Sequence, residues 1–305
     1  NIYDNKPYIK VTCNESSGDI EMIEKYIDNC ILQVEDGKRY INQIIPDSNV
    51  DSDDEGYGGL RQGRFNQTTQ RYVIVRSEMN SNKSKKNVFL PDCVRDEIFE
   101  DMDRFINNRE MYNKYGIPYT RGHLMFGPPG TGKTSVIKAI SDEYGIPIYS
   151  LDLSICKSNS EVSTIFTMIK NDVAKDQLYI VALEDFDKSV IYAKNKKNPK
   201  ISFDMLYNNL DGIIECPGRI LFVTCNDIEK FSADEALIRP GRLDKIIKID
   251  YIKLPELIKM IESVFSDFGF EYDGIFDNFL MKNKISPAIV QNLIIKNMYT
   301  PEKIV

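Results

Sequence analysis

The feature that most constrains the fold is the stretch GPPGTGKT at residues 127–134. It follows a short apolar run, HLMF, and leads into TSVIKAISDEYG, where apolar residues recur at helical spacing. In such a strand–loop–helix unit, glycines let backbone N–H groups and the positive end of the helix dipole face a phosphate group. The pattern predicts a phosphate-binding loop made of Gly127, Pro128, Pro129, Gly130, Thr131, Gly132, Lys133 and Thr134. The alternative is a Gly/Pro-rich turn that fits the pattern by chance, and the strand–helix context argues against it.

Helical and apolar stretches alternate around this loop, which predicts an α/β fold with a parallel sheet covered by helices. The short apolar runs that predict five parallel strands are 123–126, 148–153, 178–183, 220–224 and 246–250. They define a large domain at 86–250. Residues 251–305 show only helical spacing and predict a small helical domain, and residues 1–85 mix helical and β-rich pieces, as expected of an α+β domain.

Two adjacent carboxylates end one of the predicted strands. The run IVAL is followed directly by Glu184 and Asp185. In a phosphate-binding fold this strand would end beside the phosphates, where one carboxylate holds Mg²⁺ together with the Thr134 hydroxyl and the other orients the attacking water. The usual order is Asp then Glu, so Glu184 stands in the metal position and the shorter Asp185 in the water position. The alternatives are that both share the metal and water roles, or that the strand end merely meets solvent.

Two more polar motifs follow. Asn226 ends the strand in LFVTCND, where an amide can hydrogen-bond the nucleophilic water and the γ-phosphate, although an Asn after a strand is commonly a turn former. Arg239 and Arg242 flank a Pro-Gly bend in ALIRPGRLD. Such a pair alone is usually just solvated. Together with the loop and the carboxylates, it predicts guanidinium groups that stabilise charge on a transferring phosphoryl group.

The motifs GPPGTGKT, LEDFD, LDG, VTCND and ALIRPGRLD resemble, in order and spacing, those of AAA ATPases. The phrases FEDMDRFINNREMYNKYGIPYTRGHLMFGPPGTGKTS, LYNNLDGI and ISPAIVQNLI are similar to the Bcs-type branch. That branch is named for a mitochondrial chaperone that moves the folded Rieske iron–sulfur protein across the inner membrane during respiratory complex III assembly. The resemblance covers roughly residues 88–295, and Glu before Asp is a trait of this branch.

The resemblance implies a P-loop AAA+ core with a helical lid, ATP and Mg²⁺ as ligands, and Mg²⁺-dependent ATP hydrolysis. It implies a homo-oligomeric ring of six or seven copies, in which Arg239 and Arg242 enter the neighbour's nucleotide site. Ser286 is expected to cap a lid helix, with Pro287 in its first turn. The residues expected to help wall the adenine are Ile117, Pro118 and Tyr119. Ordinary linker packing is the alternative for these three.

The favoured substrate is a macromolecule, above all a folded protein, that the ring remodels or translocates as a chaperone or assembly factor. Threading members of the AAA class carry an aromatic-aliphatic-glycine triplet after the second strand, whereas residues 153–161 contain no aromatic residue and no glycine. The basic run at 194–200 is either a solvated loop or a pore lining that attracts an acidic protein or a nucleic acid. Two alternative functions are an ATP-dependent assembly module with little turnover and a nucleic-acid remodeller. The net charge of −7 argues against a surface built throughout for nucleic acid.

Cysteine usage and hydropathy indicate the compartment. Six cysteines without Cys-x-x-Cys spacing favour a reduced, intracellular setting, whether cytoplasmic, organellar or viral. No apolar run approaches the roughly 18–20 residues of a transmembrane helix, so we expect the chain as given to be soluble. Because the given sequence begins at Asn1 rather than Met, the alternative of an upstream segment that anchors the protein to a membrane is left open.

Overall fold

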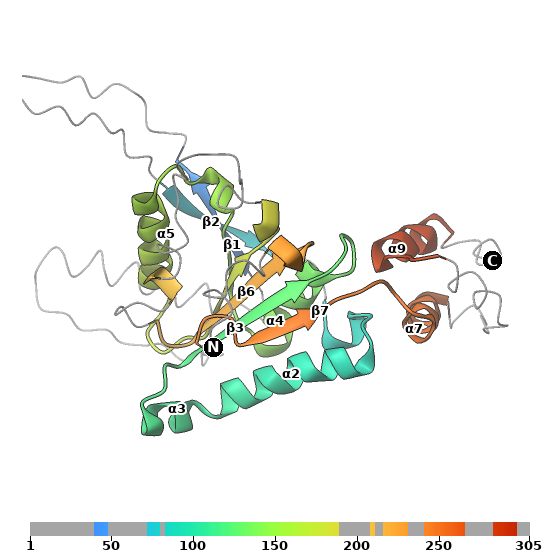
Figure 1. The fold of residues 1–305 in the computed structure, drawn as a ribbon, viewed down its shortest axis with the longest axis horizontal. Coiled ribbons are helices and arrows are strands. Elements are labelled where there is room, and N and C mark those ends of the chain that lie inside the picture. Colours follow the sequence, from blue (N-terminus) through green and yellow to red (C-terminus); the bar gives the residue numbers. More distant parts are fainter. Residues whose placement is uncertain are drawn as a thin grey trace, which may run out of the picture. The chain divides into compact units, whose positions relative to one another are not determined.

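The computed structural model describes residues 40–47, 72–79, 83–188, 208–210, 216–230, 241–265 and 283–297, all within one unit, Arg39–Val305. The strands are β1 (Tyr40–Pro46), β2 (Tyr72–Glu78), β3 (Thr120–Phe126), β4 (Ile148–Ser150), β5 (Tyr179–Leu183), β6 (Arg219–Cys225) and β7 (Lys245–Lys248). The α-helices are α2 (Asp92–Asn107), α3 (Arg109–Tyr115), α4 (Lys133–Tyr144), α5 (Asn159–Asp172), α7 (Leu254–Phe265) and α9 (Pro287–Lys296) (Figure 1). Short 3₁₀ turns are η1 (Lys85–Asn87), η2 (Leu153–Ile155), η3 (Phe186–Lys188) and η5 (Ile228–Lys230).

The strands of the described residues form one sheet in the order β2-β1-β4-β5-β6-β3-β7. Strands β1, β4, β5, β6, β3 and β7 run parallel to one another, and β2 at the edge pairs antiparallel with β1. The five predicted strands are β3 to β7, which confirms the parallel α/β core. The sheet nevertheless has seven strands rather than five. The sequence indicated β structure near β1 and β2 but assigned it to a separate domain, because local pattern does not specify which edge a strand pairs with.

The sheet therefore crosses the limit predicted at residues 85/86 between the first two domains. The assignment of 1–85, 86–250 and 251–305 stays a prediction, because most of residues 1–82 lie outside the described part of the chain.

Two apolar layers cover the two faces of the sheet. Every residue of β5 and β6 is buried, as expected for central parallel strands. Along β5, Val181 and Leu183 pack with α5, whereas Ile180 and Ala182 pack with α2 and α4 on the opposite face (Figure 1). This alternation gives the sheet an apolar layer on each face, and the carboxyl edge of the sheet carries the candidate site.

The predicted helical lid is present as α7 and α9, which share a small core of their own. Among the described residues, the lid contacts the large domain through Phe89, which packs on the lid core, and through two polar contacts. Ala288 N–H donates to the Gly130 carbonyl oxygen (3.2 Å), and Lys259 Nζ lies 2.9 Å from the Asp92 carboxylate. Within the described residues, no helix combines the length and the apolar character needed to cross a membrane.

Candidate functional site

The predicted phosphate-binding loop connects β3 to α4, and its backbone requires glycine. Gly127, Gly130 and Gly132 have φ values of 150°, 75° and 103°, which residues with a side chain rarely adopt. A Cβ on Gly127 would stand 1.8 Å from the carbonyl oxygen of Ile249, so the loop begins pressed against the chain that leaves β7. After Gly132 the chain enters α4, whose first N–H groups have no partner within the helix and are available to an anion.

Lys133 is buried at the start of α4, and three acceptors hold its ammonium group. Nζ donates to the carbonyl oxygens of Gly127 (2.7 Å) and Pro128 (2.9 Å) and to Asn226 Oδ1 (3.1 Å). Burial lowers the pKa of Lys133, and the charge of Asp185 raises it. A phosphate group in the loop would favour the charged ammonium further.

Glu184 and Asp185 follow β5 and have different partners. The Glu184 carboxyl is crowded by surrounding protein, which raises its pKa, while a hydrogen bond with the Thr134 side chain lowers it. Asp185 accepts a hydrogen bond from Asn226 Nδ2 at Oδ1 (3.3 Å) and one from Lys188 Nζ at Oδ2 (2.7 Å). Glu184 therefore lies beside the Thr134 hydroxyl, and Asp185 lies beside the Asn226 amide, which also contacts Lys133.

The backbone at Asp185 gives a physical reason for the order Glu then Asp. Its φ of 48° lies in the left-handed region, which Asp and Asn adopt more readily than other residues with a side chain. The Asp185 N–H donates to Thr224 Oγ1 (3.1 Å), which ties this turn to β6. The longer side chain stands at Glu184, where it reaches Thr134. The Glu–Asp order thus suits the sharp turn that the chain makes after β5.

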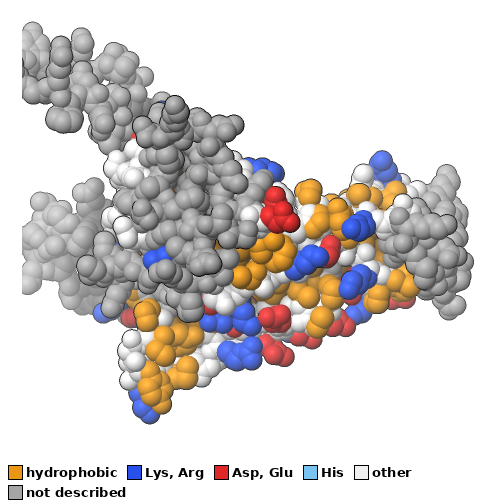
Figure 2. Space-filling view, in the orientation of Figure 1, with side chains coloured by type: hydrophobic (Ala, Val, Ile, Leu, Met, Phe, Trp, Pro, Cys, Tyr) orange, Lys and Arg blue, Asp and Glu red, His pale blue; other side chains and the backbone are white. Residues whose placement is uncertain are grey.

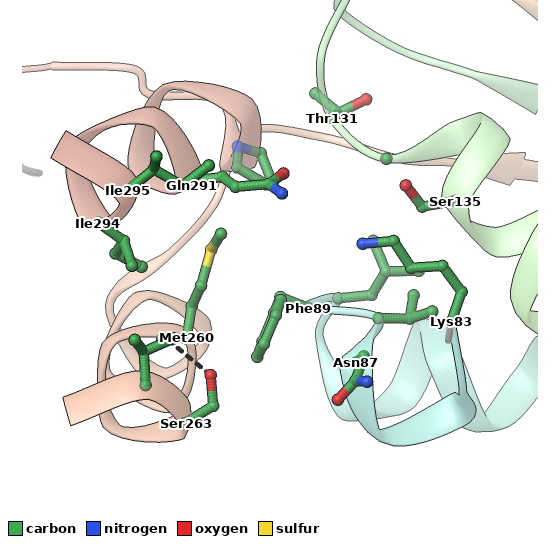
Figure 3. A pocket seen from close by; sticks show the side chains of 15 residues that line it. Lys83, Asn87, Phe89, Thr131, Ser135, Met260, Ser263, Gln291, Ile294 and Ile295 are labelled. Atoms are coloured by element: carbon green, nitrogen blue, oxygen red, sulfur yellow. Dashed lines mark hydrogen bonds between the residues drawn. The ribbon is translucent and has the colours of Figure 1, made fainter. Parts of the chain in front are cut away.

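Two cavities of about 360 Å³ each meet at the start of α4. The first contains the loop and the acidic residues and is lined by Pro129, Gly130, Gly132, Lys133, Thr134, Ser135, Glu184, Asp185, Lys188, Thr224, Asn226, Pro287, Ala288 and Gln291. We call it the phosphate cavity. The second, here the base cavity, is lined by Lys83, Asn87, Val88, Phe89, Leu90, Thr131, Gly132, Ser135, Met260, Ser263, Val264, Pro287, Gln291, Ile294 and Ile295. Figure 3 shows Gln291 and Met260 of the lid opposite Phe89 and Ser135 of the large domain. A polar pocket continuous with a largely apolar one suits a ligand with phosphates at one end and a flat base at the other.

Comparison with known proteins agrees with this geometry. Residues 123–251 match the ATPase family associated with various cellular activities (AAA). The chain is 34% identical over 227 residues to the probable mitochondrial chaperone BCS1-B of Dictyostelium discoideum, covering 64% of this chain and 47% of that protein. It is 32% identical over 244 residues to the human mitochondrial chaperone BCS1 (73% and 55%) and 33% identical over 226 residues to an AAA-ATPase of Arabidopsis thaliana (67% and 46%).

The chain belongs to the Bcs-type AAA ATPases. It spans about half the length of the curated relatives it matches. Membership confirms the resemblance predicted from the motifs, and it implies nucleotide binding at the AAA domain.

In this Bcs-type AAA ATPase, the structure does not bring the three residues predicted to wall the adenine to either cavity. Tyr119 is buried, stacks on Phe105 with ring centroids 4.5 Å apart and donates its hydroxyl to the Phe105 carbonyl oxygen (3.3 Å). Ile117 is exposed, as are Met111 and Tyr115 of the preceding helix α3. Figure 2 shows apolar side chains on the surface at its lower left, where Figure 1 places α3. Pro118 lies between them in the chain. All three precede β3, whereas the loop follows it, so about 20 Å of strand separates them from the phosphate cavity.

The base cavity is instead walled by the segment VFL, Val88 to Leu90, which lies some forty positions before the loop and was not predicted. Its one sequence signal is a short apolar run just before the Pro91 that starts α2. Gln291 was also missed, although it lines both cavities. Nothing in helical spacing distinguishes this glutamine from any other polar lid residue.

The predicted lid residues do reach the site. Ser286 precedes α9 as its N-cap, without a capping hydrogen bond from its side chain, and Pro287 occupies the first turn as expected. Pro287 lines both cavities, and a Cβ on Gly130 would stand 3.1 Å from Ser286 Oγ and 3.1 Å from Ala288 Cβ. A side chain at position 130 would therefore crowd the lid residues Ser286 and Ala288.

Of the two predicted arginines, Arg239 lies outside the described residues, as does the basic run 194–200. Arg242 follows Gly241 in a turn that rests on β3 at Gly122. It is not among the residues that line the described cavities. Its place is near the start of β3, whereas the loop follows the end of that strand.

The oxygen atoms at the phosphate cavity fit Mg²⁺. In the described residues no cluster of three or more His, Cys, Asp and Glu forms an all-protein metal site. Magnesium in nucleotide sites is held by one or two carboxylates, a hydroxyl, waters and the phosphates themselves, so such a cluster is not required. Thr134, Glu184 and Asp185 all line the cavity beside the loop and supply that set.

Proposed function

We propose that this protein is a Mg²⁺-dependent ATP hydrolase that works as a homo-oligomeric ring and remodels or translocates a folded protein. The observation that carries the proposal is the chain of contacts from Lys133 through Asn226 to Asp185, placed at the mouth of the phosphate-binding loop. It joins the group that binds phosphate to the group that can orient water. A simple structural turn would need neither.

The residues have distinct proposed roles. Lys133 and the loop N–H groups bind the β- and γ-phosphates, and Thr134 and Glu184 hold the metal. When bound, Mg²⁺ neutralises charge on the phosphate oxygens. Asp185, with its orientation set by Asn226 and Lys188, positions the attacking water. The base cavity takes the adenine and ribose between Phe89 and Met260.

A donated arginine completes the proposed site. Arg242 lies away from the cavities of its own chain, and a third cavity of about 410 Å³ gives access to Asp185 from the side of Asp152. We infer that Arg239 and Arg242 of one copy serve the nucleotide of the next. Such arginines raise phosphoryl-transfer rates by roughly 10³ to 10⁵ where they have been measured.

Protein as the substrate is supported by the relatives, of which two are called mitochondrial chaperones. The described loop after β4, which includes η2, contains no aromatic side chain to grip an extended chain. This favours a folded substrate over a threaded one. A role as an ATP-dependent assembly module with little turnover is the rival for the same site.

The test is phosphate release measured over a wide range of protein concentrations. We expect hydrolysis per chain to rise steeply with concentration and to fall by about 10³ in Arg239→Ala or Arg242→Ala. Arg104→Ala, which changes an exposed arginine of α2, is the matched control and should hydrolyse normally. ATP-dependent assembly without phosphate release would favour the assembly module. Equal activity per chain at all concentrations would exclude the shared site.

A further inference from the structure

The turn that carries Arg242 is fastened to β3 by a single carboxylate, that of Asp244. Asp244 Oδ1 accepts the Gly241 N–H (2.7 Å), which closes the turn on itself. Asp244 Oδ2 accepts the Gly122 N–H (2.9 Å), and the Asp244 N–H donates to the Gly122 carbonyl oxygen (2.8 Å). One side chain therefore both shapes the turn and attaches it to the sheet.

Gly122 allows the turn to lie directly on the strand. A Cβ at this position would stand 1.6 Å from the Arg242 carbonyl oxygen, far inside van der Waals contact. No other residue type at position 122 is compatible with the observed backbone of the turn. The position of Arg242 along β3 is thus fixed by contact as well as by hydrogen bonds.

The strand is itself braced behind this point. Arg121 and His123, on either side of Gly122, both bond Asp101 of α2. Asp101 accepts from Arg121 Nε at 2.9 Å and Nη2 at 2.6 Å, and His123 Nε2 lies 3.0 Å from Asp101 Oδ2. Asp101 and His123 are buried. The backbone that holds the turn is therefore itself held rigidly on α2.

This bracing serves no described cavity of the same chain. From residue 122 to the loop at 127 the strand advances about 16 Å, at roughly 3.3 Å per residue. The Arg242 turn is therefore remote from its own chain's phosphate cavity. Rigid placement at this distance suits a guanidinium that acts on the nucleotide of a second copy, as the proposed function assumes.

We propose that Asp244 is a positioning residue, which sets the geometry of Arg242 for the nucleotide site of a second copy of this chain. The inference rests on the proposed function, since it assumes hydrolysis at a shared site. A reacting group displaced by about 1 Å can lose a factor of about 10² in rate. Loosening this turn should therefore lower kcat while the chain's own ATP affinity stays intact.

Asp244→Asn is the first variant, because it keeps the size of the side chain but replaces an accepting oxygen with an NH₂ group that cannot accept from an N–H. We expect kcat to fall by about 10- to 100-fold, with KM and the Kd for a fluorescent ATP analogue within about twofold of the parent. Asp96→Asn, which removes an exposed carboxylate of α2, is the control and should leave both unchanged. Arg121→Lys keeps the charge but loses the two-pronged bond to Asp101, and should give a smaller loss of the same kind.

Mixing two variants distinguishes a role of Asp244 in arginine donation from a general role in stability. Lys133→Ala chains cannot hold phosphate but keep an intact Arg242 turn. When they are mixed with Asp244→Asn chains, each Asp244→Asn pocket beside a Lys133→Ala chain receives a well-placed arginine. We expect the mixture to hydrolyse ATP faster than the sum of the two variants measured separately. A merely destabilised chain would not be rescued in this way.

A mixture of Lys133→Ala with Arg242→Ala, in place of Asp244→Asn, tests arginine donation separately from the role of Asp244. If Arg242→Ala is rescued by Lys133→Ala but Asp244→Asn is not, the shared site stands and the role of Asp244 is wrong. If neither is rescued, arginine donation between copies is wrong, and the proposed function fails with it. If Asp244→Asn does not bind the ATP analogue, Arg121→Lys takes its place in the mixture, and a full kcat in that variant overturns the inference.

Discussion

Removing the carboxylate of Asp101 should strongly destabilise the fold, because it leaves one buried and one half-buried donor without their acceptor. Asp101→Ala strips the Arg121 guanidinium of two hydrogen bonds and His123 Nε2 of one. The His123 side chain is 0% exposed, so water cannot replace the lost partner. The Arg121 side chain is 23% exposed and can be partly rehydrated.

The magnitude follows from these exposures. Breaking a buried ion pair by removing one partner costs about 3–5 kcal/mol, and an unsatisfied buried donor alone costs about 1–3 kcal/mol. Because Arg121 retains some water and the charge of Asp244 nearby, we expect the lower part of the first range, about 3–4 kcal/mol. Urea denaturation should show this as a lower midpoint with an unchanged m-value.

The apolar double replacement Asp101→Leu with Arg121→Met is the matched comparison. Replacing both charges leaves no unpaired guanidinium, so the double variant should lose less stability than Asp101→Ala. If the double variant loses as much stability as Asp101→Leu and Arg121→Met lose in sum when made separately, the unpaired guanidinium is not the cause of the loss. A free energy of unfolding for Asp101→Ala within about 0.5 kcal/mol of the parent, the usual range of surface substitutions, would also refute the view that the unpaired donors destabilise the fold.

The pKa values of Asp101 and His123 predict how the stability of the fold depends on pH. Burial raises the pKa of Asp101, but hydrogen bonds from His123 and Arg121 outweigh it, so the pKa is lowered overall. Burial lowers the pKa of His123. In both cases the unfolded chain binds the proton more tightly, so stability decreases as pH falls below about 6.5 for His123 and again below about 4 for Asp101. In Asp101→Ala the loss below about pH 4 should be smaller.

Five substitutions test the nucleotide site itself. Lys133→Ala should weaken ATP binding by about 10- to 100-fold, since a hydrogen bond to a charged group contributes about 1.5–3 kcal/mol, and calorimetry measures it. Glu184→Gln should impair Mg²⁺-dependent ATP binding more than Asp185→Asn does. Asp185→Asn should bind ATP without hydrolysing it, which a filter-binding assay detects as retained ATP. The reverse pattern would mean that Glu184 and Asp185 exchange the metal and water roles. Gly130→Val should displace the lid from the loop, because a Cβ already meets the lid at 3.1 Å and position 130 has a φ of 75°, and nucleotide should protect the lid from proteolysis less well than in the parent. Gln291→Ala should raise the Kd for both ATP and ADP about equally, since Gln291 lines both cavities; an effect on ATP alone would place it at the γ-phosphate.

The parts of the site that sequence predicts well are those encoded within one strand–turn unit. The loop at 127–134, the carboxylates after β5 and Asn226 after β6 each stand directly after a buried parallel strand. Parallel strands in one sheet end at a common edge, so local patterns suffice to bring these residues together. The contacts of Lys133 and Asp185 with Asn226 are the result.

The base cavity could not be predicted in the same way, because its walls come from segments that are remote in the sequence. Val88 to Leu90 and the lid residue Gln291 meet only after α2, the sheet and the lid have packed. Ile117 and Tyr119 stand nearer the loop in the chain, which made them plausible, yet β3 separates them from it. The sequence indicated β structure near β1 and β2, but their place in this sheet escaped prediction for a similar reason, since β1 finds its partner β4 more than a hundred residues later.

The contacts of β7 explain how the loop and the arginine turn keep a constant separation. β7 pairs with β3 from His123 to Phe126, and the chain on either side of β7 presses on a glycine of β3's segment: Arg242 on Gly122 before it, Ile249 on Gly127 after it. In both places a Cβ would stand less than 2 Å from a carbonyl oxygen, so there is no slack at either end. A displacement of the loop at Gly127 must therefore either move β7 as a unit or break its ladder with β3. Breaking this ladder would leave backbone N–H and C=O groups of β3 and β7 without their partners, so the pairing opposes such a displacement. The start of the phosphate-binding loop and the Arg242 turn are thus both packed against the same strand pair, β3 and β7.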